Sequence, residues 1–220
     1  MQNLPFPAQT TVISLPTGPL RLLRPANPAA VIDAVSELDA DEKLPYWAEL
    51  WPSAMGMAMA LDGGEIPVAG RDVTELGCGL GLCALAAARA GARRVLASDW
   101  YTECLAFTQA SAGENGLALE TRVMDWRDPP ADASADVVLA ADVLYERRNA
   151  TDVAAALDRL VRPGGEAWVA DPGRTYLVNL RAAMESKVGF RLVERTMQVV
   201  SPLVPQGRAE IHLLRFSRAD

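Results

Sequence analysis

The fold is decided by the stretch Asp72-Val-Thr-Glu-Leu-Gly-Cys-Gly-Leu-Gly81. Its first half is typical of a short buried strand, which runs into a G-x-G-x-G turn at Gly77, Gly79 and Gly81. Residues 82–90 are almost all Ala, Leu and Cys, a composition that favours a helix. Glycines allow a close backbone approach to a ligand, and a helix N-terminus offers free N–H groups to an anion. The stretch therefore predicts the first unit of a nucleotide-binding α/β sheet.

A second predicted strand, residues 94–99, ends in an acid, Asp99. A doubly wound sheet places its ribose-binding carboxylate at this point. A tight turn without a ligand also explains a lone glycine triplet. The spacing is plausible for NAD as well, but Glu75 precedes the first glycine and the turn is not G-x-G-x-x-G.

The rest of the chain extends this pattern to a full sheet. We expect three more buried strands, at residues 120–126, 135–142 and 166–171, and further helices at 101–114, 152–161 and 181–187. Residues 190–200 and 210–216 are rich in β-formers, and the Pro/Gly loop between them is too short for a crossover helix. They should therefore pair antiparallel. The sequence predicts an α/β fold with a Rossmann-like, doubly wound, seven-stranded sheet that ends in an antiparallel strand pair.

The N-terminal region has a different pattern, and we expect residues 1–44 to form an extension or lid on a domain of residues 45–220. Residues 10–15 and 20–23 predict a small β-hairpin, followed by a helix at 28–38 with Asn27 as its cap. Residues 39–43 are a polar connector.

Composition narrows the class of protein. The chain has 220 residues, half of them hydrophobic, which is enough for one full core. Its net charge of −7 makes nucleic acid a poor first partner, and no apolar run is long enough to span a membrane. We expect a cytoplasmic protein without a metal site, because Cys78, Cys83, Cys104 and the single His212 lack zinc-ligand spacing. The oligomeric state is not predicted.

Three further clusters supply candidate site residues. Trp47 and Trp51 either fill the core from one helix face or form an aromatic wall, which would suit a sulfonium. Asp125 and Trp126 end the third strand, and Asp125 is either an ordinary turn-forming residue or part of a binding site at this end of the sheet. The fourth strand delivers Asp142-Val-Leu-Tyr145 to the carboxyl edge of the sheet, where ligands of open α/β folds lie.

The stretch Glu75-Leu-Gly-Cys-Gly-Leu-Gly81 resembles motif I of the class I S-adenosylmethionine-dependent methyltransferases. The Trp51-Pro52 pair and Asp142-x-x-Tyr145 resemble elements of the seven-strand protein-lysine methyltransferases. Asp171-Pro-Gly-Arg174 resembles a motif of the branch that methylates the β subunit of electron-transfer flavoprotein. The resemblance covers residues 45–175, and Glu146 stands where the family has an acid.

This resemblance implies a set of site residues. It implies S-adenosylmethionine contacts from Trp51, Glu75, Gly77, Cys78, Gly79, Gly81, Asp99, Trp100, Asp125, Trp126 and Ala141. It implies a substrate site formed by Trp47, Asp142, Tyr145 and Arg174. Asp142 and Tyr145 are the implied catalytic pair, with Asp142 orienting the acceptor amine and Tyr145 forming a wall of its channel. A carboxylate favours the charged form of an amine, so Asp142 alone would not promote its deprotonation.

We therefore expect an S-adenosylmethionine-dependent N-methyltransferase that acts on a lysine of a protein. One alternative is an N-methyltransferase of a small, nicotinamide-like amine, and another is a non-catalytic module that binds S-adenosylmethionine and regulates a partner. An open, acidic rim around Asp142 would favour a protein acceptor, whereas a closed lid would favour a small molecule. The Asn/Asp-Pro-Pro-Tyr motif of DNA adenine and glutamine methyltransferases is absent, and we interpret Asp128-Pro-Pro130 as a turn.

Overall fold

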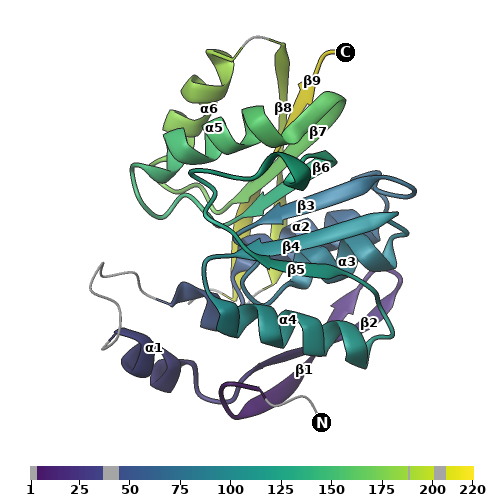
Figure 1. Ribbon diagram of the computed structural model, residues 1–220, viewed down its shortest axis with the longest axis vertical. Helices are drawn as coiled ribbons and strands as arrows, with labels where there is room; N and C mark the ends of the chain where they lie inside the picture. Colours follow the sequence, from purple (N-terminus) through teal and green to yellow (C-terminus); the bar gives the residue numbers. More distant parts are fainter. Residues whose placement is uncertain (1–3, 37–44, 188, 201–206) are drawn as a thin grey trace.

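A computed structural model describes residues 4–36, 45–187, 189–200 and 207–220 (Figure 1). Its main sheet has seven strands in the order β5-β4-β3-β6-β7-β9-β8. The strands are β3 (Asp72–Leu76), β4 (Arg94–Asp99), β5 (Glu120–Val123), β6 (Ala135–Ala141), β7 (Val161–Asp171), β8 (Phe190–Val200) and β9 (Arg208–Arg218). The first five are parallel, and β9 lies between β7 and β8, antiparallel to both. The predicted doubly wound sheet with a terminal antiparallel pair is confirmed.

Helices cover both faces of the sheet. They are α2 (Pro52–Asp62), α3 (Leu82–Arg89), α4 (Thr102–Glu114), α5 (Asn149–Leu160) and α6 (Leu177–Glu185). Along β6, Val137 and Leu139 belong to the same apolar cluster as α2, α3 and α4, whereas Val138 and Ala140 pack with α5 and α6. Successive strand side chains point to opposite faces, so β6 is buried between two helical layers. No helix in the described part of the chain is long and apolar enough to cross a membrane.

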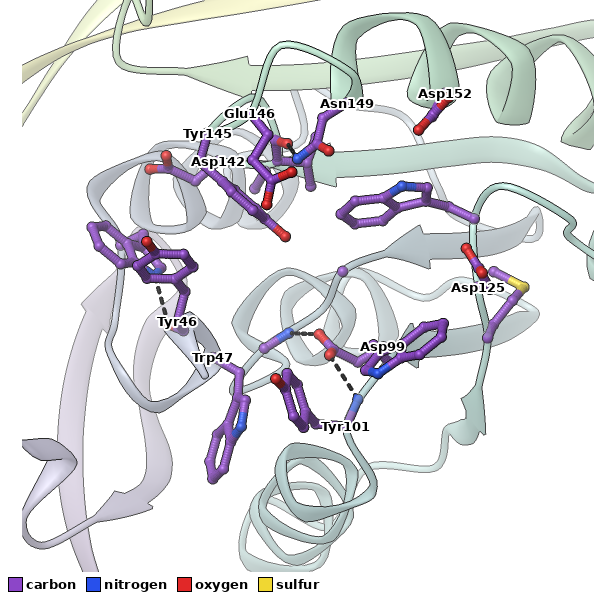
Figure 2. Close-up of a pocket in the computed structure, with 18 of the residues that line it drawn as sticks. Tyr46, Trp47, Asp99, Tyr101, Asp125, Asp142, Tyr145, Glu146, Asn149 and Asp152 are labelled. Atoms are coloured by element: carbon purple, nitrogen blue, oxygen red, sulfur yellow. Dashed lines mark hydrogen bonds between the residues drawn. The ribbon is translucent and has the colours of Figure 1, made fainter. Parts of the chain in front are cut away.

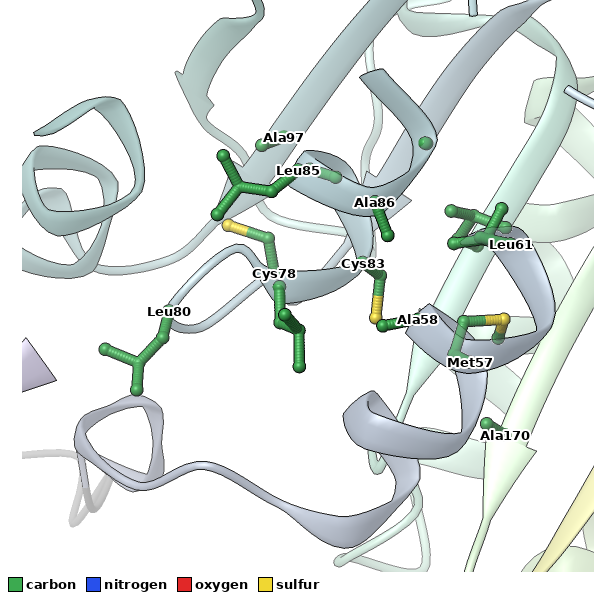
Figure 3. Packing of buried hydrophobic residues seen from close by; sticks show 14 of the residues in the cluster. Met57, Ala58, Leu61, Cys78, Leu80, Cys83, Leu85, Ala86, Ala97 and Ala170 are labelled. Carbon is green, nitrogen blue, oxygen red and sulfur yellow. The ribbon is translucent and has the colours of Figure 1, made fainter. Parts of the chain in front are cut away.

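Small side chains let α2 and α3 pack closely beneath the glycine turn. Figure 3 shows Met57 and Leu61 of α2 beside Cys83 and Ala86 of α3, all of them buried. The Ala-rich composition that predicted a helix therefore also brings the two helices together. This packing holds the N-terminus of α3 at the carboxyl end of β3.

The N-terminal extension is a separate two-stranded sheet, β1 (Ala8–Leu15) and β2 (Gly18–Pro25), followed by α1 (Pro28–Ser36). Its turn is anchored to α2, because Asp62 accepts hydrogen bonds from the backbone N–H and the hydroxyl of Thr17, both at 2.7 Å. On the other side, the backbone N–H of Leu23 donates to the hydroxyl of Ser111 in α4. The hairpin thus lies beyond α4, away from α5 and α6 (Figure 1). The predicted connector at 39–43 lies outside the described residues.

Several element ends differ from the sequence prediction. Strand β7 begins at Val161, directly after α5, because Val161 pairs with Ala135 of β6 across a register shift. Residues 162–165, which separate the helix predicted at 152–161 from the strand predicted at 166–171, therefore lie within the strand. Helix α5 begins at Asn149, three residues early, where the side-chain amide of Asn149 donates to the carbonyl of Val143 at 2.8 Å. These contacts join segments that sequence periodicity treats separately.

Candidate active site

A cavity of about 320 Å³ opens at the carboxyl ends of β3, β4 and β6 (Figure 2). The strand order reverses here, since β4 lies on one side of β3 and β6 on the other. Asp142 and Tyr145 lie on one side of the cavity, and Asp99 and Tyr101 lie on the opposite side. Most of the predicted site residues line it: Trp47, Trp51, Gly77, Gly79, Asp99, Trp100, Asp125, Trp126, Ala141, Asp142, Tyr145 and Arg174.

The glycine turn forms the floor of the cavity. Gly77 and Gly79 have φ angles of +63° and +51°, in the left-handed region that favours glycine. A Cβ atom at Gly77 would lie 3.0 Å from the ring of Trp126, so a side chain there would crowd the cavity wall. The turn is fixed to β4, because the backbone N–H of Gly79 donates to Asp99 Oδ2 at 2.9 Å.

Asp99 is a buried acid with a defined orientation. Its Oδ1 atom accepts the backbone N–H of Tyr101 at 3.1 Å, so the start of α4 also depends on it. Burial raises the pKa of Asp99, while the backbone N–H groups of Gly79 and Tyr101 oppose this shift. The carboxylate lies on the cavity wall, where its predicted contact with a ribose is sterically available.

A second group closes the far end of the cavity, after β5. This strand ends at Val123, so Asp125 and Trp126 lie in the loop that follows, and not on the strand as predicted. Asp125 accepts hydrogen bonds from the guanidinium of Arg127 at 2.6 to 2.9 Å. The guanidinium of Arg127 in turn lies over the ring of Trp100, 5.6 Å from its centroid. Arg127 was not predicted, although its position two residues after Asp125 in a turn was a usable signal.

Glu75 and Cys78 lie behind the glycine turn. They line a smaller cavity of about 30 Å³ that shares Trp51, Gly77, Gly79 and Ala141 with the larger one. Glu75 Oε2 accepts the backbone N–H of Ala84 at 2.8 Å, which caps the first turn of α3. Burial raises the pKa of Glu75 to about 8. The structure also brings the side chains of Cys78, Asp99 and Cys104 together, with the two Sγ atoms and a carboxylate oxygen within 4.8 Å of one another.

Gly81 has a packing role in this structure. Its φ is +78°, and a Cβ atom there would lie 2.3 Å from Cγ2 of Thr108 in α4. Among the described residues, the lining of neither cavity includes Gly81. The third glycine of the motif therefore allows α4 to pack against the start of α3.

The carboxylate of Asp142 is buried at the end of β6. Asp142 has a φ of +60°, which is uncommon for a residue other than glycine. Its Oδ1 atom accepts a hydrogen bond from Nε of Arg174 at 2.7 Å and forms an ion pair with Nη2 of the same residue at 2.5 Å. Its Oδ2 atom is buried and has no hydrogen-bond partner among the described residues. Because Asp142 also lines the cavity, this oxygen is available to accept a hydrogen bond from a bound polar group.

Tyr145 stands at the mouth of the cavity and is 39% exposed. Its ring lies 5.2 Å from that of Tyr46, centroid to centroid. Burial, reinforced by the charges of Asp99 and Glu146, raises the pKa of Tyr145 to about 12. The phenol therefore stays protonated at neutral pH and can donate a hydrogen bond or form a wall.

The two tryptophans lie on different elements, which excludes the alternative that both fill the core from one helix face. Trp47 is in the short 3₁₀ helix η1 (Tyr46–Ala48), where it packs between Phe6 and Phe107 while lining the cavity. Trp51 precedes α2, and its Nε1 donates to the carbonyl of Tyr46 at 2.8 Å. The guanidinium of Arg174 lies 5.7 Å from the centroid of the Trp51 ring.

Other lining residues were missed by the sequence analysis. They are Tyr46, Tyr101, Met124, Arg127, Val143, Arg148, Asn149 and Asp152, with Glu146 noted only as a family acid. Most are direct neighbours in sequence of a predicted site residue, which was the available signal. Asn149 and Asp152 had none, because they reach the cavity from the first turn of α5.

Comparison with known proteins gives a consistent family. Residues 73–165 match a family model described as "Methyltransferase domain". An electron transfer flavoprotein β-subunit lysine methyltransferase from Danio rerio is 30% identical over 151 residues, which are 67% of this chain and 58% of that protein. A ribosomal protein L11 methyltransferase from Photobacterium profundum is 31% identical over 48% of this chain and 34% of its own length. The chain thus spans about half the length, or less, of these curated relatives.

Solved structures support the fold. A ribosomal protein L11 methylase from Lactobacillus delbrueckii has a TM-score of 0.59 at 20% identity, covering 76% of this chain and 79% of that one. An N-methyltransferase from Bradyrhizobium japonicum in complex with S-adenosyl-L-homocysteine has a TM-score of 0.58 at 13% identity, covering 75% and 85%. The glycine cradle, the buried acids and the cavity at the strand ends fit a bound S-adenosylmethionine. The chain therefore carries a methyltransferase domain with the class I fold, and its cavity suits S-adenosylmethionine as the cofactor.

Proposed function

We propose that this protein is an N-methyltransferase that transfers methyl from S-adenosylmethionine to a lysine of a protein. The observation that carries the proposal is the buried Asp142 carboxylate beside Tyr145, with one oxygen that has no hydrogen-bond partner in the described part of the chain. The 30% identical relative is named for transfer to a lysine of a protein. The L11 methyltransferases are likewise named for a protein substrate.

The lining of the cavity has more acidic than basic groups, which favours a cationic side chain as acceptor. Among the described residues it has five carboxylates and three guanidiniums: Asp99, Asp125, Asp142, Glu146 and Asp152, with Arg127, Arg148 and Arg174. Each guanidinium forms an ion pair with one of these carboxylates, which leaves an excess of two acids. Within the described part of the chain, the lining begins at Tyr46, and the β1–β2 hairpin packs against α4 instead. A lining with this excess of acids, without the hairpin above it, agrees better with a protein acceptor than with an enclosed small amine.

The residues support the chemistry by holding and orienting groups. When bound, S-adenosylmethionine supplies a methyl group on a sulfonium, which is already activated for displacement. Gly77 and Gly79 leave room for it, and we expect Asp99, Asp125 and Trp126 to hold its nucleoside. Asp142 Oδ2 can orient the acceptor nitrogen and stabilise the positive charge that develops on it. Tyr145 narrows the approach and excludes water.

The test is transfer of radiolabelled methyl from S-adenosylmethionine in a lysate of the source organism, followed by separation of proteins from small molecules. Label in one protein band, absent with Asp142→Ala, would support the proposal and provide the acceptor for site mapping. Label in the small-molecule fraction would support the small-amine alternative. Calorimetric binding of S-adenosylmethionine without transfer to any fraction would support the regulatory module and count against the proposal.

A further inference from the structure

Arg174 reaches Asp142 from the loop after β7, so the two residues belong to neighbouring strand ends. Both of its contacts go to one oxygen, Oδ1, at 2.7 and 2.5 Å. The side chain of Asp142 is 2% exposed, whereas that of Arg174 is 31% exposed. The guanidinium is thus more exposed than the carboxylate that it contacts, and Oδ2 has no hydrogen-bond partner among the described residues.

The loop that carries Arg174 is fixed by a second buried acid, Asp171. Asp171 Oδ1 accepts the backbone N–H groups of Gly173 and Arg174 at 2.8 and 2.6 Å. Gly173 has a φ of +83°, and a Cβ atom there would lie 3.3 Å from Nε2 of His212. This turn therefore points the Arg174 side chain back across the strand ends, towards Asp142.

Trp51 holds the guanidinium from the other side. The Arg174 guanidinium lies 5.7 Å from the Trp51 ring centroid, within the range of a cation–π contact. Trp51 is itself held by its hydrogen bond to the carbonyl of Tyr46. A planar guanidinium can pair with a carboxylate and stack on an indole at once, which an ammonium does less well. Arg174 is thus fixed by Asp142, by its own backbone and by Trp51.

The proposed methyl transfer requires a neutral amine, and the ion pair between Arg174 and Asp142 bears on this requirement. Nitrogen attacks the methyl group with a lone pair, which an ammonium lacks. A lone carboxylate in a low-dielectric site stabilises the ammonium and raises the pKa of the acceptor amine. Arg174 places a permanent positive charge on that carboxylate, because a guanidinium does not lose its proton in the working pH range.

We propose that Arg174 is a positioning residue that acts through Asp142. It offsets the charge of the carboxylate, so the acceptor ammonium releases its proton to bulk water near neutral pH while Asp142 Oδ2 still orients the nitrogen. The neutral amine then forms the N–C bond as the S–C bond to the methyl group breaks, and S-adenosylhomocysteine leaves. This inference deepens the proposed function and rests on it. It gives Arg174 a role in setting the protonation of the acceptor, in place of the direct contact implied by resemblance.

Other charged and titratable groups face this end of the cavity from several elements. They are Tyr46 on η1, Asp99 on β4, Tyr145, Glu146 and Arg148 on the loop after β6, and Asp152 on α5. Behind the lining, Asp171 on β7 interacts electrostatically with Asp142, and His212 on β9 lies beside Gly173. Glu75, whose pKa is raised to about 8, lies behind the glycine turn. All of these groups are retained in the variants below, so the difference between two pH profiles reports on Arg174.

The first test measures kcat between pH 6 and 10 on the protein acceptor labelled in the lysate assay. In Arg174→Gln, the apparent pKa that describes the fall of kcat at low pH should rise by about one unit. At pH 7 kcat should fall about tenfold with KM unchanged or lower, and it should recover towards wild type at high pH. Arg174→Lys, which keeps the charge, should keep the wild-type pKa. An equal loss at every pH would overturn the inference.

The matched control is Arg181→Gln in α6. Arg181 is 30% exposed and pairs with Glu194, so this variant removes a comparable ion pair outside the cavity lining. Its pH profile should match that of wild type. A shift as large as that of Arg174→Gln would show a general effect of lost charge and would also overturn the inference.

A second test needs no turnover and therefore separates this inference from the proposed function. N-acetyl-lysine amide is titrated by NMR at pH 7 into wild type and Arg174→Gln, each saturated with S-adenosylhomocysteine. The variant should bind about tenfold more tightly, because the charge of Asp142 is exposed to the ammonium. N-acetyl-norleucine amide, which lacks the side-chain amine, should bind wild type and Arg174→Gln with equal affinity. Equal affinity, or no measurable binding by the variant, would contradict the inference even if no protein acceptor were found.

Discussion

Gly79 donates its backbone N–H to Asp99 Oδ2 at 2.9 Å, which ties the glycine turn after β3 to the end of β4. The other carboxylate oxygen accepts the N–H of Tyr101 at the start of α4. Asp99 thus organises the floor of the cavity and also lies on its wall. We therefore expect the Asp99 side chain to contribute both to the stability of the site and to its affinity for the cofactor.

Replacement of Asp99 should weaken both properties. Asp99→Ala leaves two backbone N–H groups without their acceptor, and we expect a loss of about 1–3 kcal/mol in the free energy of unfolding. Affinity for S-adenosylmethionine should fall tenfold or more, as one charged hydrogen bond is worth about 1.5–3 kcal/mol. Asp99→Asn retains one oxygen acceptor and should lose less. Calorimetry and urea unfolding measure the two effects, and unchanged affinity in Asp99→Ala would exclude the ribose contact.

Gly81 offers a test of packing. In Gly81→Ala, the new Cβ would meet Cγ2 of Thr108 at 2.3 Å in a left-handed conformation. We expect a loss of about 3–5 kcal/mol in the free energy of unfolding from overpacking and backbone strain together. Gly116→Ala is the control, because Gly116 has a φ of +64° but no atom within 4 Å of the added Cβ. It should lose about 1–2 kcal/mol from the backbone alone. Equal losses would argue against the clash with Thr108.

Replacement of Asp142 should reduce methyl transfer without a comparable loss of affinity for S-adenosylmethionine. Asp142→Ala removes the carboxylate at the cavity mouth, and methyl transfer should fall by about 100-fold or more. Affinity for S-adenosylmethionine should stay within a few-fold, since Gly77, Gly79 and Asp99 are untouched. Asp142→Asn, which keeps the shape without the charge, should also be slow. Filter-binding transfer assays and calorimetry give the two quantities, and transfer at the wild-type rate in Asp142→Ala would refute the assignment of this acid.

Glu75 should make stability depend on pH. Its folded-state pKa of about 8 lies above the ordinary value of 4.5 for a glutamate. Between these pH values the folded chain holds a proton that the unfolded chain releases, so stability should fall as the pH rises from 4.5 to 8. In Glu75→Gln this contribution disappears. Urea unfolding at pH 5, 6.5 and 8 should therefore show a smaller decline for the variant, and parallel declines would contradict the buried, protonated carboxyl.

The sequence alone determined the sheet and most of the cavity wall. Buried strands, glycine turns and polar residues at strand ends are local patterns, and they follow from hydrophobic periodicity and backbone conformation. Parallel strands bring their carboxyl ends to one edge, so Asp99 and Asp142 could be assigned to one cavity although 43 residues separate their numbers. The position of Asp125 was predicted less well, because β5 ends two residues before it.

The tertiary structure decided which side chains meet. Arg174 pairs with Asp142 across 32 residues, Gly81 is required by Thr108, and Cys104 lies beside Cys78. Strand β9 also enters the sheet between β7 and β8. None of these contacts leaves a periodic signal, because each depends on the distance between two packed segments and on the rotamers that their packing allows. Local sequence therefore determines which secondary structure each segment forms, whereas packing determines which side chains of different segments contact one another.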